Sequence, residues 1–246
     1  MITYIISHKG VDNHRNRNLL YVLEWLEKID KISNVIVVEQ DTESRINLSR
    51  SYRYKMTHIF LENNKDFFNK SWAYNVGFKN DDTDNEWIGF GDNDVIMRPE
   101  IFNSNISEGV KSSDTFSPYK SVNDLNDKDT INLIENNIFP IGEKRKAGSP
   151  FCGGIFFIKK KLFYECGGWN EGFINWGAED DEFSNRIVKM NKLHFGDESI
   201  HLFHERSVNS THNNKYYSNN IKEYHKSIHG GYDFNWELMG DILKYK

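Results

Sequence analysis

The chain has 246 residues, with 36 acidic and 31 basic side chains, a formal net charge of −5, 38% hydrophobic residues and only 4 prolines. This length suits one large α/β domain, and no segment rich in proline, serine or glycine marks a linker, so we expect a single domain over residues 1–246. The negative charge and the absence of a basic run argue against a nucleic-acid partner, whose phosphates need a basic surface.

The only two cysteines are Cys152 and Cys166. Two thiols do not make a disulfide framework, so we expect both to be reduced and buried, as in a cytosolic protein. The apolar run at residues 1–6 is too short for a signal peptide, and no stretch reaches the ~20 residues of a membrane span. The sequence therefore predicts a cytoplasmic protein with no integral membrane segment.

Residues 2–7 predict a buried first strand, and apolar residues at helical spacing from Leu19 to Ile29 predict a helix. Between them lies a polar segment that contains Arg15 and Arg17. A segment between strand and helix is the usual ligand site of an open α/β sheet. Two arginines there can face a diphosphate; the alternative is a pair of solvated arginines at a helix start.

Residues 34–39 predict a second strand, parallel to the first, which ends in Glu39-Gln40-Asp41. An acid or an amide at such a strand end can bind a uracil edge or a ribose. The pattern leaves these three residues as alternatives, of which we take Gln40 as the nucleotide-binding candidate. Residues 57–62 predict a third strand, and a helix with one apolar face follows it at residues 67–78.

Residues 87–91, WIGFG, predict a strand that leads directly into Asp92-Asn93-Asp94. Successive side chains alternate in direction at a strand end, so one carboxylate can hold a divalent cation while the other holds a sugar or a ribose. Acids are common in turns, so an Asp-x-Asp alone is a weak motif. The position of the motif directly after a hydrophobic strand makes it a stronger indication of a binding site.

Residues 104–150 form the least patterned part of the chain, which we interpret as a variable segment that shapes the acceptor site. A strand is expected near residues 115–117 and a helix near residues 130–136. The basic triplet at residues 144–146 could meet an anionic acceptor, although a solvated charge run is the preferred interpretation.

The densest pattern lies at residues 149–190. A Gly-Gly turn precedes a buried strand at residues 155–158, a short helix and a second Gly-Gly turn follow, and Trp176 and Gly177 then precede four acids at residues 179–182. The apolar spacing after the acids puts them in the first turn of a helix. Acidic first turns are ordinary helix starts, but a helix N-terminus at a cleft also fixes and ionises a carboxylate base.

His201 and His204 follow, three residues apart, and can converge on one metal ion. The alternative is two ordinary surface histidines. The polar residues 208–220 predict a mobile loop, and residues 221–228 a closing helix. The apolar positions of the tail, from Trp236 to Leu243, could pack on the domain or on a partner.

Several of these motifs together resemble one family. The patterns G-G-x-aliphatic, G-G-x-N-E-x-F and W-G-x-E-D-D-E-F-x-x-R at residues 153–186, with F-N-K-x-x-x-x-N-x-G-F at residues 68–78, resemble the beta-1,4-galactosyltransferases and the bacterial chondroitin-type polymerases, which are A-type glycosyltransferases. The resemblance runs from His14 to Arg206 and skips residues 104–146. It implies a mixed, mostly parallel central sheet flanked by helices, with a nucleotide-binding half (1–98) and an acceptor-binding and catalytic half (99–246).

The resemblance also implies roles for individual residues. Asp180, the second acid of W-G-x-E-D, would be the general base, and Trp176 and Glu179 would line the acceptor site beside it. Asp94, His201 and His204 would bind the metal; His201 stands where the vertebrate enzymes have Met, so the resemblance supports it less than His204. The implied contacts to the nucleotide-sugar come from Arg15, Arg17, Gln40, Lys70, Asn75, Asp92, Phe151 and Gly154.

The implied function is an inverting, metal-dependent transfer of galactose or N-acetylgalactosamine from a UDP-sugar to a hydroxyl of a glycan or glycoconjugate acceptor. Two imidazoles and one carboxylate suit Mn²⁺ better than Mg²⁺, with other divalent cations as alternatives. The loop at residues 208–220 would close over the donor, and the protein could act at the membrane surface where lipid-linked acceptors are built.

Three other functions stay open. A retaining N-acetylgalactosaminyltransferase-like enzyme would share the fold, but those enzymes resemble W-G-x-E-N and lack the acid at Asp180. A non-catalytic module that binds sugars or nucleotide-sugars would not need the base, the metal set and the Asp-x-Asp together. A metal-dependent hydrolase is the third, although the sequence has no second metal cluster.

Overall fold

The computed structural model describes residues 1–10, 12–48, 50–65, 67–140, 143–144, 151–206 and 211–245. Most of the basic triplet at residues 144–146 and part of the predicted loop at residues 208–220 therefore lie outside the described residues. In the described part of the chain, no helix has the length and apolar character needed to cross a membrane. Both cysteines are free thiols there, as predicted, but only Cys152 is fully buried.

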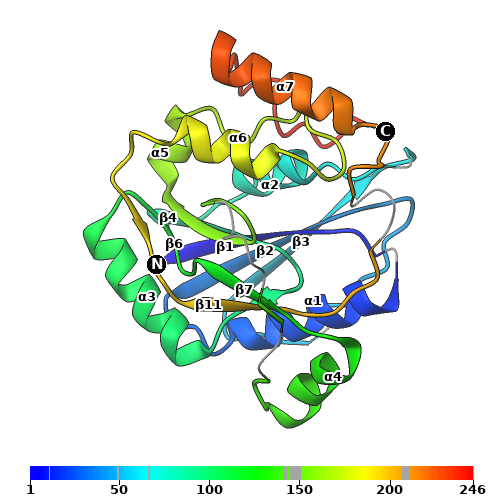
Figure 1. Cartoon of the computed structure of the whole chain (residues 1–246), viewed down its shortest axis with the longest axis vertical. Helices are drawn as coiled ribbons and strands as arrows, with labels where there is room; N and C mark the ends of the chain where they lie inside the picture. Colours follow the sequence, from blue (N-terminus) through cyan, green and yellow to red (C-terminus); the bar gives the residue numbers. More distant parts are fainter. Residues whose placement is uncertain are drawn as a thin grey trace.

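The central sheet has seven strands in the order β10-β6-β9-β4-β1-β2-β3. Figure 1 labels β6, β4, β1, β2 and β3 of this sheet. The run β4-β1-β2-β3 is parallel throughout, while β9 is antiparallel to both of its neighbours. This confirms the mixed, mostly parallel sheet. The bounds are β1 (Ile2–His8), β2 (Ile32–Asp41), β3 (Lys55–Glu62), β4 (Trp87–Gly91), β6 (Thr115–Ser117), β9 (Ile155–Lys159) and β10 (Lys192–His194).

Two cores lie on the two faces of this sheet, because alternate side chains of a strand point to opposite faces. Tyr4 and Ile6 of β1 join the core that contains α1 (Asn13–Leu26) and α3 (Pro99–Ser112). Ile5 joins the core of the opposite face. That face is covered by α2 (Lys70–Lys79), α5 (Lys160–Glu165) and α6 (Glu179–Arg186), with α7 (Tyr217–Gly230) stacked outside α6 (Figure 1).

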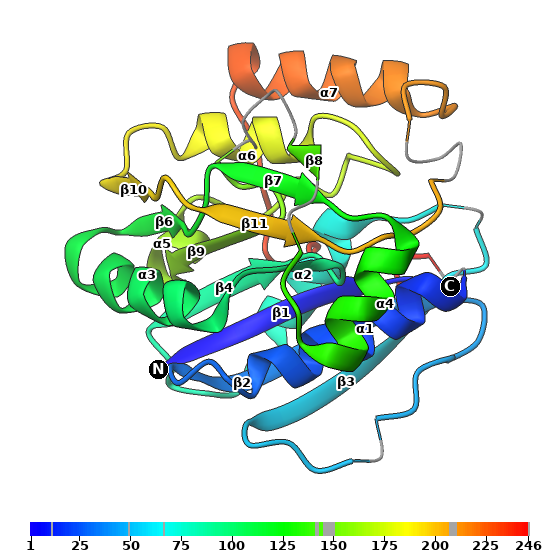
Figure 2. The same ribbon diagram turned by 60° about the horizontal axis from the view of Figure 1, so that its bottom comes forward.

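A second, four-stranded sheet has the order β5-β11-β7-β8 and lies across one end of the central sheet (Figure 2). Its strands are β5 (Val95–Ile96), β11 (Glu198–His201), β7 (Ser121–Asp124) and β8 (Glu143–Lys144), and α4 (Asp127–Asn136) follows β7. The expected strand at residues 115–117 and the helix near residues 130–136 are confirmed. The small sheet was not predicted, because strands this short show no clear alternation.

Two predicted boundaries were wrong. α1 begins at Asn13 instead of Leu19, because the side chain of Asp12 caps it by accepting a hydrogen bond from the backbone of Arg15 at 2.8 Å. The end of the predicted loop at residues 208–220 is helical, since α7 begins at Tyr217. The tail packs on the domain, where the indole of Trp72 donates to the carbonyl of Asp241 at 2.7 Å.

Candidate active site

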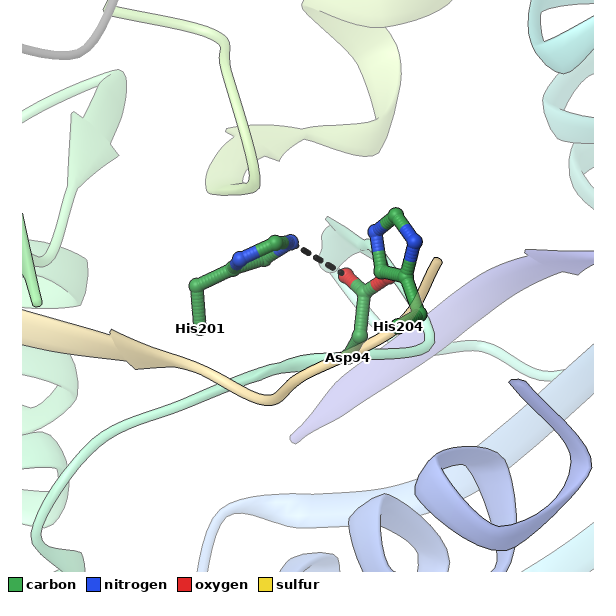
Figure 3. Close-up of side chains that lie close together, drawn as sticks. All are labelled: Asp94, His201 and His204. Carbon is green, nitrogen blue, oxygen red and sulfur yellow. Dashed lines mark ion pairs between the residues drawn. The ribbon is translucent and has the colours of Figure 1, made fainter. Parts of the chain in front are cut away.

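Three side chains that are distant in the sequence meet at the junction of the two sheets. Asp94, His201 and His204 each place one ligand atom within 4.8 Å of the others, and Figure 3 shows the carboxylate between the two imidazoles. Nε2 of His201 lies 3.7 Å from Asp94 Oδ1, and Nε2 of His204 lies 3.3 Å from Asp94 Oδ2. We call these three residues the metal triad.

Strand pairing brings the metal triad together. Asp94 immediately precedes β5, which pairs with β11 in a register that sets His201 opposite Val95. The backbone N–H of Leu202 donates to the carbonyl of Asp94 at 2.7 Å, which fixes the chain on its way to His204. The two imidazoles meet edge to face, with centroids 5.1 Å apart. The triad is therefore held by backbone hydrogen bonds of the small sheet.

The protonation states in the metal triad suit a cation. Burial disfavours the charge on Asp94, but His201, His204 and Arg15 beside it together hold its pKa below the usual range. Burial lowers the pKa of His204, which keeps that imidazole neutral near pH 7. An ionised carboxylate and a neutral imidazole are the forms that ligate metals. The donor set of one oxygen and two nitrogens thus fits a transition-metal dication such as Mn²⁺.

A second group of charges lies around Lys70, the first residue of α2. Its Nζ lies 3.1 Å from Asp180 Oδ1, 3.2 Å from Asp92 Oδ1 and 3.8 Å from Glu179 Oε1. Asp92 also accepts a hydrogen bond from the hydroxyl of Tyr74 at 3.3 Å. We call Lys70, Asp92, Glu179 and Asp180 the acid–lysine cluster. It adjoins the metal triad, because Asp92 and Asp94 are separated by a single residue.

Charge crowding in the acid–lysine cluster shifts its proton equilibria. Burial raises the pKa of Asp180 above the usual range; Lys70 opposes this, and the negative charges of Glu179 and Asp92 add to it. Burial disfavours the ammonium of Lys70, but Asp180 and Asp92 outweigh it and raise the pKa of Lys70. Lys70 therefore stays charged, and the carboxyl group of Asp180 takes up a proton more readily than that of an ordinary aspartate.

Two residues with positive φ before α6, and a buried ion pair within it, fix the position of its first turn. Gly177 and Ala178 have φ of 133° and 68°, and the Gly177 N–H donates to Glu179 Oε2 at 3.2 Å. One turn on, Arg186 Nε contacts Glu182 Oε1 at 2.6 Å, and its other nitrogens donate to the carbonyls of Cys166 and Gly168, each at 2.7 Å.

Glu182 and Arg186 belong to the W-G-x-E-D-D-E-F-x-x-R pattern, yet sequence reasoning gave them no role. Glu182 is fully buried and also accepts a hydrogen bond from the hydroxyl of Ser227 on α7. The guanidinium of Arg186 lies over the ring of Phe183, 4.6 Å from its centroid. The end of the pattern is therefore a scaffold that fixes the orientation of α6, whose first turn carries Glu179 and Asp180.

An aromatic group lies beside the entry to α6. Trp176 is 42% exposed, Tyr217 stacks nearly parallel to it at 5.9 Å, and His212 meets it edge to face at 4.8 Å. The backbone carbonyl of Trp176 accepts a hydrogen bond from Asn214 at 2.9 Å. Sequence reasoning found Trp176 and missed His212 and Tyr217, since they lie in a polar run with no periodic pattern.

The two arginines of α1 differ in their surroundings. Arg15 lies at the metal triad, with Nη2 3.2 Å from His204 Nδ1 and Nη1 3.9 Å from Asp94 Oδ2. Arg17 contacts Asp127 of α4 at 2.8 Å and the carbonyl of Phe203 at 3.4 Å, so it braces the segment before His204. Only Arg15 is therefore placed beside the metal ligands.

Gln40, the predicted nucleotide contact at the end of β2, has partners inside the protein. The side chain of Gln40 is fully buried; it donates to the carbonyl of Asn69 at 2.7 Å and accepts from its N–H at 3.1 Å. It therefore fixes the start of α2. The two alternatives at this strand end, Glu39 and Asp41, lie on the opposite face of β2. Both accept hydrogen bonds from Arg45, at 2.8 and 3.0 Å.

Asn75, which was also predicted to contact the nucleotide, likewise has partners inside the protein. Asn75 is fully buried; it donates to the carbonyl of Trp169 at 2.8 Å and to Glu171 Oε1 at 2.9 Å, and accepts from the Trp169 N–H at 3.0 Å. It ties α2 to the second Gly-Gly turn. Gly77 is a packing position, since a Cβ there would lie 2.6 Å from Cγ2 of Ile5. The helix thus needs both residues for structural reasons.

Gly154, the second residue of the first Gly-Gly turn, and Phe151, which lies before this turn, have different surroundings. Gly154 has φ of +69°, and a Cβ there would lie 1.9 Å from the hydroxyl of Tyr119. Its carbonyl accepts the backbone N–H of Asp92 at 2.9 Å, so it supports the Asp-x-Asp turn. Phe151 is 9% exposed and meets His194 edge to face at 5.4 Å. Its predicted donor contact rests on the resemblance alone.

Comparison with known sequences connects this geometry to a family. A family model described as the N-terminal domain of galactosyltransferase matches residues 142–225. Beta-1,4-galactosyltransferase 7 of Mus musculus and that of Homo sapiens are each 25% identical to this chain over 132 residues, 53% of this chain and 33% of each relative. The match thus spans about a third of the length of these relatives.

Solved structures share the fold. S. aureus TarS aligns with a TM-score of 0.54 and 14% identity, over 82% of this chain and 36% of that chain. The mannosyltransferase PcManGT from Pyrobaculum calidifontis, in complex with GDP-Man and Mn²⁺, aligns with a TM-score of 0.50 and 14% identity, over 84% and 58%. At this identity the likeness concerns the fold alone. The chain therefore has the A-type glycosyltransferase fold and resembles the galactosyltransferase family.

Proposed function

We propose that this protein is an inverting, metal-dependent glycosyltransferase that moves galactose or N-acetylgalactosamine from UDP to a hydroxyl of a glycan acceptor. The observation that carries the proposal is the adjacency of the metal triad and the acid–lysine cluster on either side of Asn93. The names of the curated relatives support a galactose donor. The Mn²⁺ and the GDP-sugar bound by the mannosyltransferase of the same fold support a metal and a nucleotide-sugar.

The metal triad is the donor side of the site. Asp94, His201 and His204 would hold the cation, which when bound neutralises the charge that the diphosphate gains as its bond to the sugar breaks. Arg15 lies next to His204 and adds a fixed positive charge on the same side. The cation and Arg15 together would bind the leaving group, so donor affinity should depend on both.

The acid–lysine cluster is the catalytic side. The acceptor oxygen attacks the anomeric carbon, the carbon–oxygen bond to UDP breaks with its electron pair going to UDP, and the hydroxyl proton passes to a carboxylate oxygen of Asp180. Lys70 contacts Asp180 at 3.1 Å and would hold this carboxylate in place. Since one displacement has no covalent intermediate, the product would have the opposite anomeric configuration to the donor.

The acceptor side would be built from Trp176 and Glu179. Trp176 offers an exposed indole, backed by Tyr217, on which the apolar face of a sugar ring can pack. Glu179 is largely buried and its Oε2 accepts the Gly177 N–H, which fixes its carboxylate for a hydrogen bond to an acceptor hydroxyl. Phe151 stays a predicted neighbour of the donor sugar, on the resemblance.

Donor turnover tests the proposal against its alternatives. UDP-galactose and UDP-N-acetylgalactosamine are incubated with the protein and Mn²⁺, with and without a panel of glycan acceptors, and UDP release and product anomer are measured by NMR. Acceptor-dependent release with an inverted product supports the proposal. Equal release without any acceptor would indicate a hydrolase, a retained configuration would indicate a retaining enzyme, and thermal stabilisation without release a binding module.

A further inference from the structure

Resting on the proposed function, we propose that Asp124 is the positioning residue of the metal site: its carboxylate holds the imidazole of His201 so that Nε2 faces the cation. Asp124 Oδ1 lies 2.9 Å from His201 Nδ1. On the other side of the same ring, Nε2 lies 3.7 Å from Asp94 Oδ1. The imidazole therefore stands between two carboxylates, one at each nitrogen.

The position of Asp124 is fixed by strand pairing. β7 and β11 run parallel, and their register sets His201 opposite Asp124 at the end of both strands. The chain that leaves β7 is held to the same point, because the N–H of Leu125 donates to the carbonyl of His201 at 3.0 Å. The carboxylate and the ring are thus brought together by the backbone, and neither side chain has to be ordered by the cation itself.

This contact decides which nitrogen of His201 is free. A neutral imidazole carries one N–H; with Nδ1–H donating to a carboxylate, the lone pair is left on Nε2, which points to Asp94. A carboxylate that accepts from a metal-bound imidazole fixes its tautomer and ring orientation and makes it a stronger ligand. His201 would therefore present the correct atom to a metal before one arrives.

The other imidazole of the metal triad has a different partner. Nδ1 of His204 lies 2.9 Å from the carbonyl of Glu205. A backbone carbonyl can fix the same tautomer, but it carries no full charge. Nη2 of Arg15 also lies 3.2 Å from this nitrogen of His204. Of the two imidazoles, His201 is therefore the one with a carboxylate at Nδ1, and it is the ligand that the family resemblance supports least. The contact with Asp124 is therefore evidence for His201 as a metal ligand that the sequence motif alone did not provide.

The test is Mn²⁺ binding in the presence of UDP, measured by calorimetry and by electron paramagnetic resonance, with no acceptor and no turnover. Asp124→Ala is expected to weaken Mn²⁺ affinity roughly 10- to 100-fold. Asp124→Asn keeps an oxygen acceptor without the charge and is expected to fall between the parent and Asp124→Ala. The matched control is Asn123→Ala on the same strand, which removes a 2.9 Å hydrogen bond to Glu198 of β11 but touches no ligand; its affinity should equal that of the parent.

A double-mutant cycle separates positioning from a general loss of structure. If Asp124 acts through His201, Asp124→Ala should cost little in a His201→Ala background. Equal losses in both backgrounds, or parent-like affinity of Asp124→Ala in a parent that binds Mn²⁺ with UDP, would overturn the inference and leave the proposed function intact. A parent that binds no Mn²⁺ with UDP would overturn both.

Discussion

The metal triad and the acid–lysine cluster adjoin, but they are built in opposite ways. The metal triad sits at the ends of paired strands, and two of its three members are imidazoles, so it carries little charge of its own. The acid–lysine cluster sits at the starts of α2 and α6 and sets three carboxylates around one ammonium. One region is complete once a cation binds, and the other is already crowded with charge.

Because the two groups are built differently, we expect the metal triad to govern donor binding and Glu179 and Asp180 to govern the transfer step. Removal of a ligand from the metal triad should cost donor affinity, because the cation would bind the diphosphate there together with Arg15. Changes in Glu179 and Asp180 of the acid–lysine cluster should leave donor affinity in place and alter the rate, the binding of the acceptor or the pH response.

Asp94→Ala should remove Mn²⁺-dependent UDP binding. The loss should exceed about 100-fold, the upper end of what an outer-shell partner alone costs. Calorimetry with UDP, with and without Mn²⁺, measures it, and Asn123→Ala, which removes a hydrogen bond to Glu198, is the control. Unchanged Mn²⁺-UDP affinity in Asp94→Ala would remove Asp94 from the metal site.

Arg186→Met should have the largest effect on stability. It leaves the fully buried carboxylate of Glu182 without its cation and the carbonyls of Cys166 and Gly168 without donors. Breaking such a pair from one side costs about 3–5 kcal/mol in the free energy of unfolding, which urea denaturation measures. Lys161→Met, which removes an exposed contact to Glu165 at 3.7 Å, is the control. A loss no larger than that of the control would mean that α6 is held by other contacts.

Glu179→Gln should raise the KM for the acceptor while leaving kcat at saturating acceptor nearly unchanged. A hydrogen bond from a hydroxyl to a carboxylate is worth about 1.5–3 kcal/mol, so a tenfold or larger rise in KM is expected. Steady-state kinetics at fixed donor measure the split. If kcat falls as far as kcat/KM, Glu179 acts in the transition state and the two acids of this turn do not have separate roles.

The smallest effect expected is on the pH dependence of stability. The pKa of Asp180 is raised in the folded protein, mainly by burial, above the ~3.9 of an unfolded chain. Its protonated form thus favours folding, so this contribution is fully present below about pH 4 and is lost as the pH rises through the folded-state pKa. Asp180→Asn should therefore raise the Tm relative to the parent more at pH 8 than at pH 5. A difference in Tm that is independent of pH would show that Asp180 is an ordinary solvated carboxylate.

The comparison also shows what a sequence can reveal. The strands β1, β2, β3, β4 and β9 and the start of α6 were predicted because apolar runs and helical spacing are local signals, whereas β10 was not predicted. The metal triad was predicted as a set through the resemblance. Its partner Asp124 was not, because it lies in an Asn- and Asp-rich run whose link to His201 is a register between strands far apart in the chain.

The structure shows a structural use for two amides that were predicted to contact the nucleotide. Gln40 was assigned to the nucleotide because it lies at a strand end, and Asn75 because of the family resemblance. The structure uses both amides to satisfy buried backbone groups of Asn69 and Trp169, which is the other reason for a buried amide. Which of these two uses applies depends on the partner across the fold, and local spacing carries no information about that partner.

The most direct test of the account is the turnover number of Asp180→Asn at saturating donor and acceptor. Asparagine keeps the size and the hydrogen-bonding reach of the side chain but cannot accept the acceptor's proton. We predict a loss of roughly two to four decades in turnover, with the Mn²⁺-UDP affinity of the parent retained, because the metal triad is untouched. Near-native turnover would contradict the account: the four acids at residues 179–182 would then be only a helix start, and the base would lie elsewhere.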